Sequence, residues 1–179
     1  KDFPIVIDEA MKVTSYGSLL KVCKDLLHEK IPIIDMLTII EAVADIAEFT
    51  KVPEILLEHV RAKLYRLITQ KYKDTDGVLH IITIKPELEQ QFIGKLQEHH
   101  GVSQLMISIA EINNLVTKTK KLLDDIEAKG FSKITMVVDP VLRKRISEIY
   151  EKFGLQVSVL SHAELDSKAN FAIEGTLEF

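Results

Sequence analysis

The sequence has few of the residues on which disulfide-stabilised proteins depend. It contains 179 residues with a single cysteine and no tryptophan. A lone cysteine cannot form an internal disulfide, so an oxidising compartment is not implied. Cys23 stands among leucine and valine residues at helical spacing. That setting is typical of a small buried hydrophobic side chain rather than of a nucleophile.

Glycine is also scarce, and none of the seven glycines belongs to a phosphate-binding loop. Neither G-x-G-x-x-G nor G-x-x-x-x-G-K-S/T occurs in the sequence. Both motifs need glycine because the backbone must approach the phosphate groups closely. We therefore expect no nucleotide cofactor.

Histidine and serine offer only weak candidates for a metal or catalytic site. His99 and His100 are adjacent, and neighbours on a helix point roughly 100° apart, so they cannot easily share an ion. Ser161, His162 and Glu164 have the residue types of a catalytic triad, but a triad is defined by geometry and not by nearness in sequence. We expect a surface helix end at the histidine pair and turn chemistry at the serine. The prediction is no enzyme, no metal and no cofactor.

Charge and hydropathy exclude further classes of protein. The net charge is −4, from 23 basic and 27 acidic residues, and without a basic excess we expect no nucleic-acid partner. The basic cluster at residues 143–145 is short and typical of a solvated helix face. No apolar run approaches the roughly 20 residues of a membrane span, and no signal peptide is recognisable. Because Lys1 opens what reads as structured sequence, we expect the chain to be part of a longer protein.

The first part of the chain has helical periodicity. Its most apolar stretch, residues 30–48, carries two apolar stripes and one narrow polar strip, so a helix there must be surrounded on most sides. Pro32 suits the first turn of that helix, and Asp35 lies near the end that favours a negative charge. Helices are predicted at residues 3–13, 18–30, 33–48 and 53–72. Four helices with short connections predict a compact bundle.

The period changes to that of strands after the polar segment 73–77, whose aspartate-glycine dipeptide indicates a turn. We place a boundary there, between subdomains 1–73 and 74–179. Strands are predicted at residues 78–84, 134–138, 156–160 and 171–177, and helices at 86–99, 108–129 and 140–153. The crossover between the second and third strands predicts that they are parallel, and the last strand is expected to add antiparallel. The fold class is α+β, a four-helix subdomain followed by a small α/β subdomain with a mixed sheet of about four strands.

Several groups of residues occur in an order and spacing that extend over nearly the whole chain. They are Pro32-Ile33, Asp35, Ile39-Ile40-Glu41-Ala42, Val60-Arg61, Leu64, Arg66, Ile68, Pro140, Leu142-Arg143, Val159-Leu160-Ser161 and Glu164. This pattern resembles the cytoplasmic domain of the FHIPEP family, the export-gate proteins of flagellar type III secretion systems and of their virulence relatives. The match is to the last two of four cytoplasmic subdomains. The chain departs from the family pattern at Ile34, Val52 and His162-Ala163. Contacts that the different side chains of relatives make at these positions are therefore not expected in this chain.

The resemblance implies a role in protein secretion and not in catalysis. Proteins of this family are anchored in the bacterial inner membrane, and their cytoplasmic domains assemble as a ring, largely through the helical subdomain. They receive export substrates and the chaperones of those substrates, and they cooperate with the export ATPase complex. The best-known chaperone pocket lies upstream of the matching part, so no pocket residue is transferred. The alternative is a small α/β enzyme or ligand-binding domain of unknown substrate, against which the glycine and cysteine usage argues.

Charged strips on two predicted helices are the candidate interface of such a ring. The helix at 33–48 presents an acidic strip, and the following helix a more basic one. A ring needs a contact between two different surfaces of neighbouring copies, and opposite charge suits that need. The alternative is that both strips simply face water. The predicted interface residues are Asp35, Glu41, Asp45, Glu48, Lys63 and Arg66.

Overall fold

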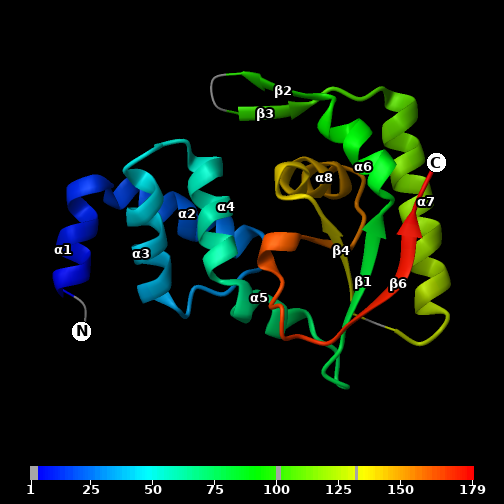
Figure 1. Ribbon diagram of the computed structural model, residues 1–179, viewed down its shortest axis with the longest axis horizontal. Coiled ribbons are helices and arrows are strands. Elements are labelled where there is room, and N and C mark those ends of the chain that lie inside the picture. Colours follow the sequence, from blue (N-terminus) through cyan, green and yellow to red (C-terminus); the bar gives the residue numbers. More distant parts are fainter. Residues whose placement is uncertain (1–3, 100–101, 132) are drawn as a thin grey trace. The chain divides into compact units, whose positions relative to one another are not determined.

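The computed structural model describes residues 4–99, 102–131 and 133–179 of the chain (Figure 1). The chain divides into two compact units, Lys1–Ile68 and Thr69–Phe179. The first unit is helical and the second is built around a sheet, which confirms the predicted α+β class. The division falls inside helix α5 (Tyr65–Tyr72), whereas the boundary predicted from the sequence lies just after that helix.

Helices form the described part of the first unit. They are α1 (Pro4–Val13), α2 (Tyr16–His28), α3 (Met36–Ala47), α4 (Pro53–Lys63) and the first half of α5. Helix α3 packs between α1 and α4, and α4 also packs against α2 (Figure 1). Ile39 and Val43 of α3 are fully buried, as expected of a helix with two apolar stripes. Helix α3 is therefore the centre of this unit.

The start of α3 differs from the prediction. The helix begins at Met36, and Pro32 lies before it instead of in its first turn. Asp35 is the N-cap: its carboxylate accepts hydrogen bonds from the Thr38 backbone N–H at 3.2 Å and from the Thr38 hydroxyl at 2.8 Å. Aspartate caps a helix well because it satisfies a backbone N–H that has no partner within the helix. The helix therefore starts after its aspartate N-cap and not at the proline.

The single helix predicted at residues 53–72 is wrong, because it is broken at Leu64. Leu64 is the C-cap of α4, and its N–H bonds to the carbonyls of Val60 and Arg61. Its side chain is almost fully buried, and α5 begins at the next residue. Neither proline nor glycine occurs at the break, so the local sequence does not predict it.

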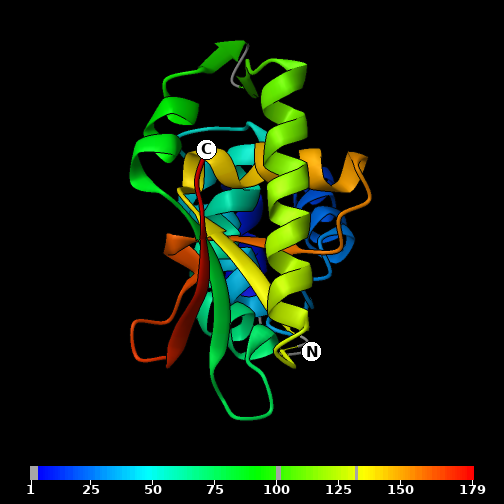
Figure 2. The same cartoon turned by 90° about the vertical axis from the view of Figure 1, so that its right-hand side faces the viewer.

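The second unit contains a four-stranded parallel sheet with the order β5-β4-β1-β6. Its strands are β1 (Leu79–Ile84), β4 (Ile134–Val138), β5 (Ser158–Ser161) and β6 (Phe171–Leu177). The parallel pairing of β4 with β5 confirms the predicted crossover, whose helix is α8 (Pro140–Lys152). Helix α7 (Ile109–Glu127) starts with a capping box between Ser108 and Glu111 and packs against β6 (Figure 2).

The antiparallel addition predicted for β6 is wrong, since β6 runs parallel to β1. The segment after β5 opens with a short 3-10 helix, η1 (His162–Glu164), and carries the chain back to the end of the sheet where β1 begins. There the Leu79 N–H bonds to the Asn170 carbonyl at 2.9 Å. The hydroxyl of Thr69 donates to the Glu164 carbonyl at 3.0 Å and accepts from the Asp166 N–H at 2.9 Å. An anchored return segment thus replaces the expected turn.

The helix predicted at residues 86–99 is also wrong beyond its first half. Helix α6 (Pro86–Ile93) ends at Gly94, and an antiparallel hairpin of β2 (Leu96–His99) and β3 (Val102–Leu105) follows. His99 therefore lies on a strand and not at a helix end, and His100 lies outside the described residues. The expected solvated face at residues 143–145 is wrong as well, because Arg143 is only 1% exposed on α8.

The core of the second unit lies between the sheet and its helices. Fully buried members include Ile82 of β1, Met136 of β4 and Leu115 of α7. The Tyr150 hydroxyl donates to the Met136 sulfur at 3.1 Å and lies 2.8 Å from the Thr119 hydroxyl, so a buried polar group is satisfied inside this apolar cluster. These contacts hold α7 and α8 to the sheet and to each other.

Candidate functional site

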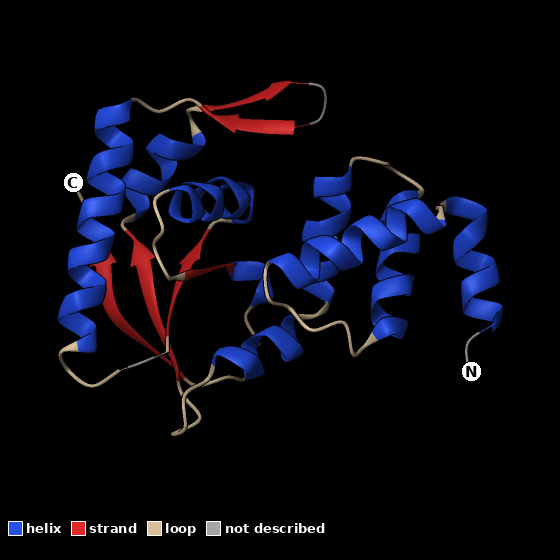
Figure 3. Cartoon of the chain, turned by 180° about the vertical axis from the view of Figure 1, so that it is seen from behind, coloured by secondary structure: helices blue, strands red, loops and turns tan. Residues whose placement is uncertain are grey.

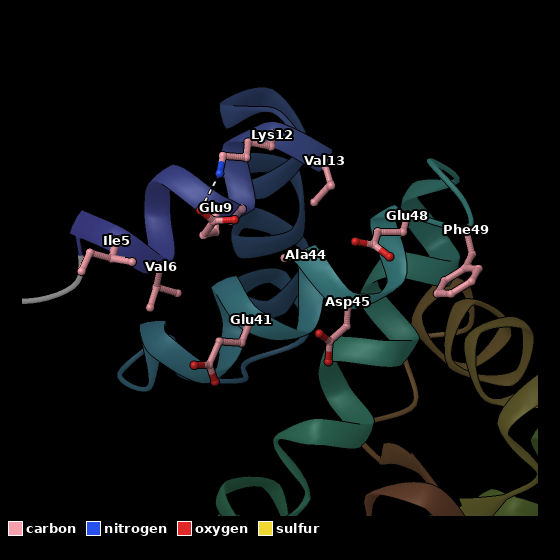
Figure 4. A pocket seen from close by; sticks show the side chains of 11 residues that line it. Ile5, Val6, Glu9, Lys12, Val13, Glu41, Ala44, Asp45, Glu48 and Phe49 are labelled. Atoms are coloured by element: carbon pink, nitrogen blue, oxygen red, sulfur yellow. Dashed lines mark hydrogen bonds and ion pairs between the residues drawn. The ribbon is translucent and has the colours of Figure 1, made fainter.

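A groove of about 760 Å³ lies between α1 and α3 in the helical unit (Figure 4). Its apolar lining comes from three parts of this unit: Ile5, Val6 and Val13 of α1, Ala44 of α3, and Phe49 just after α3. Ile5 is 76% exposed and Phe49 is 83% exposed. Large apolar side chains gathered at a groove in this way are a feature of interaction surfaces.

Acidic side chains line the same groove. Glu41 and Asp45 of α3 and its C-cap residue Glu48 belong to the predicted acidic strip, and their spacing of four and three residues places them on one face. Glu41 and Glu48 have no ion-pair partner within the described chain. Opposite them, Glu9 of α1 pairs with Lys12 of the same helix. The groove thus combines an apolar lining with an excess of negative charge.

The other predicted interface residues lie elsewhere. Asp35 is occupied as the N-cap of α3 and does not line the groove. The Lys63 ammonium is 3.9 Å from the Asp45 carboxylate, and both side chains are at least half exposed, so the pair adds little stability. The guanidinium of Arg66 lies 5.4 Å from the Tyr65 ring centroid. The structure therefore brings Lys63 to Asp45 within one chain, and it pairs Arg66 with an aromatic ring.

Sequence reasoning missed the part of the groove that comes from α1 and Phe49. Helix α1 buries only Ala10 among its described residues, and its other apolar side chains are half-buried or exposed. The available signal was the apolar side of the short helix predicted at residues 3–13, together with a phenylalanine directly after the acidic strip.

The residues of the groove favour binding over catalysis. They supply carboxylates, one lysine and hydrocarbon, and no hydroxyl, thiol or imidazole. Among the described residues, no group of three or more histidine, cysteine, aspartate or glutamate side chains is placed to hold a metal ion. Cys23 is buried, as predicted, and burial raises the pKa of its thiol above the ordinary value, which keeps it protonated.

Ser161, the last residue of β5, and Glu164 perform turn chemistry, as expected at the serine. Ser161 and Glu164 form a capping box around the 3-10 helix, and the Ser161 N–H donates to the Glu164 carboxylate at 2.7 Å. Both residues are buried. In the part of the chain that the structure describes, no helix is long and apolar enough to cross a membrane.

Comparisons with known proteins identify the family. The model of the FHIPEP family matches residues 1–170. The flagellar biosynthesis protein FlhA of Helicobacter pylori strain J99 is 39% identical over 178 residues, which is 99% of this chain and 24% of that protein. The chain therefore spans about a quarter of the length of this relative.

Solved structures agree in fold. The nonameric SctV-C of EPEC superimposes with a TM-score of 0.86 at 20% identity, over 98% of this chain and 52% of that one. The CdsV protein of Chlamydia pneumoniae, in a complex with CdsO, superimposes with a TM-score of 0.85 at 20% identity, over 99% of this chain and 52% of that one. The fold and the family match point to one conclusion: the chain belongs to the FHIPEP family.

Proposed function

We propose that this chain is a non-enzymatic docking and ring-assembly module of a flagellar type III protein export gate. Membership of the FHIPEP family supports the link to export, and the relative from Helicobacter pylori supports the flagellar system. The nonameric SctV-C of EPEC, which has this fold, supports assembly into a ring. On this proposal the chain lies on the cytoplasmic side of a protein anchored in the inner membrane.

The observation that carries the proposal is the acidic groove of the helical unit. It has the features of a docking surface, with exposed apolar side chains beside unpaired carboxylates, and lacks those of an active site. In a ring each copy contributes one surface to one neighbour and a different surface to the other. We assign Glu41, Asp45 and Glu48 to one of these surfaces. Lys63 and Arg66 are the candidates for the other surface that the sequence offers, and Lys63 already lies beside Asp45 within its own chain.

Further partners follow from the proposed place in the export apparatus. Export substrates, their chaperones and the export ATPase complex would be received by this domain or by its neighbours. The complex of CdsV with CdsO supports a partner protein that docks on domains of this fold. Within this chain, the proposal assigns no residue to a substrate or a chaperone.

Charge reversal in the groove tests the assembly. Glu41→Lys places a cation among the groove carboxylates, so we expect weaker self-association of the chain in sedimentation velocity and reduced export in cells. Glu127→Lys reverses another exposed glutamate, on α7 in the other unit, and is the matched control. Self-association that is equally strong in the wild type, the control and Glu41→Lys would contradict the assignment of the groove. A wild type that stays monomeric at every concentration would contradict assembly by this chain.

A further inference from the structure

Helix α2 presents apolar side chains to solvent. Tyr16 is 71% exposed, Leu20 55% and Leu27 53%, while Val22 and Leu26 on the inward-facing side of the helix are fully buried. The exposed residues are spaced by four and seven, so they follow one face of the helix. A stripe of large apolar side chains on one exposed face is the pattern of a helix that docks in a groove.

This face of α2 also carries positive charge. Lys21 and Lys24 are exposed beside the apolar stripe. Lys21 pairs with Asp25 one turn further on, whereas Lys24 has no ion-pair partner within the described chain. The groove has the opposite character, since its lining holds four carboxylates against one lysine, a net charge of −3. The two surfaces are therefore complementary in charge, and both are apolar at their centres.

The stripe and the groove are separate surfaces of one unit. The groove belongs to α1 and α3, and no residue of α2 lines it. Helix α2 packs against α4 and crosses it on the side that faces the viewer in Figure 3. Two different and complementary surfaces on one unit allow a head-to-tail contact between copies, in which each copy gives its stripe to one neighbour and its groove to the other.

We propose that the outer face of α2 in one copy docks in the groove between α1 and α3 of the next copy. Tyr16 and Leu20 meet the apolar lining, and Lys24 meets the unpaired carboxylates Glu41 and Glu48. This contact rests on the proposed ring assembly and deepens it by naming the second surface. In this contact the acidic groove receives α2 of the neighbouring copy instead of Lys63 and Arg66.

Site-directed crosslinking tests the contact directly. In a Cys23→Ser background, Leu20→Cys and Ala44→Cys place one cysteine on the stripe and one in the groove of every chain. A short bis-maleimide crosslinker should then link copies into a ladder of trimers and larger species, because each chain carries both halves of the contact. Either cysteine alone can give at most dimers. The pair Arg66→Cys and Ala44→Cys tests the competing contact, in which the groove receives Arg66 of the next copy instead of α2.

The outcomes separate this contact from the assembly itself. A ladder from the Leu20→Cys and Ala44→Cys pair supports the contact. Adding Lys24→Glu should reduce the yield of the ladder by roughly fivefold, and adding Glu41→Lys as well should restore that yield. A ladder from the Arg66 and Ala44 pair alone overturns the α2 contact but leaves the ring proposal intact. If no pair gives a ladder and the wild type remains monomeric, both proposals fail.

A second measurement needs no cysteine. Leu20→Asp puts a charge into the proposed contact, so we expect the Kd of self-association to rise by about tenfold or more. Val141→Asp is the matched control, because Val141 is a similarly exposed apolar residue, at 52%, on α8 of the other unit. Unchanged thermal unfolding of both variants would show that folding is intact. Equal Kd values for the two variants would overturn the proposal.

Discussion

His80 of β1 lies between two carboxylates in the second unit. Its imidazole Nδ1 lies 2.7 Å from the Glu174 carboxylate and its Nε2 lies 3.5 Å from the Asp76 carboxylate. Burial lowers the pKa of His80, but the hydrogen bond to Glu174 and the charges of Asp76 and Glu174 outweigh it, and the pKa is raised above 6.5. Protonated His80 therefore ties the edge strand β6 and the turn before β1 to the sheet.

The raised pKa predicts how stability depends on pH. A histidine whose pKa is higher in the folded state stabilises the fold fully below its unfolded pKa of about 6.5, and this contribution is lost as pH rises through the folded pKa. We expect the free energy of unfolding in urea to decline across that interval. His80→Gln should flatten the decline, because glutamine keeps polarity but cannot be protonated.

A second histidine acts in the opposite direction and provides the control. Burial, followed by the nearby charge of Lys63, lowers the pKa of His59, so its contribution is lost as pH falls. His59→Gln should therefore leave the decline above pH 6.5 in place. The assignment to His80 fails if His80→Gln and the wild type show parallel pH profiles.

At the scale of elements, the sequence predicted best what is local and amphipathic. The apolar periods of α2, α3 and α8 and the apolar run of β4 were found near their true positions, because one buried face leaves a repeat of fixed spacing. In contrast, no proline or glycine marks the break at Leu64, and the direction of β6 depends on contacts distant in sequence. The bonds of Thr69 to the return segment join residues more than ninety positions apart, which no local pattern reveals.

The candidate site was predicted to the same degree and for the same reason. The spacing of Glu41, Asp45 and Glu48 along one helix predicted their common face correctly. That α1 forms the other wall, and that Lys63 pairs within its own chain, depends on how separate helices pack. The exposed face of α2 became recognisable only once its inner face was known to be buried.

Thr69 holds the segment that carries the chain back to the start of β6, so a substitution there tests what this segment contributes. Its hydroxyl is buried and holds both Glu164 and Asp166 of the return segment. Thr69→Val keeps the shape but leaves these backbone groups unpaired, so we expect a loss of about 1–3 kcal/mol in the free energy of unfolding. Thr176→Val is the matched control, since the Thr176 hydroxyl is exposed and lies 3.2 Å from the Thr83 hydroxyl. Equal losses in urea unfolding would refute this role of Thr69.

In the molecule as a whole, the division between the two units falls inside α5. The predicted boundary after residue 73 assigns all of α5 to the helical unit, whereas the division by compactness falls after Ile68. A helix forms cooperatively, since its later N–H groups bond to carbonyls one turn earlier. The N–H of residue 73 still bonds to the Thr69 carbonyl, at 3.2 Å. We therefore propose that α5 opens as one piece with the helical unit.

Hydrogen exchange in a core variant decides between the two boundaries. Ile40 is 6% exposed in the middle of α3, so Ile40→Ala should destabilise the helical unit by about 2–5 kcal/mol. We expect the amides of α2, α4 and the whole of α5 to exchange faster, while those of β1 and β4 do not change. Ile34→Ala, at a side chain 78% exposed, is the matched control and should change neither set. If the second half of α5 keeps the exchange rates of the sheet, the boundary lies inside the helix, and if the sheet amides accelerate equally, the two units unfold as one.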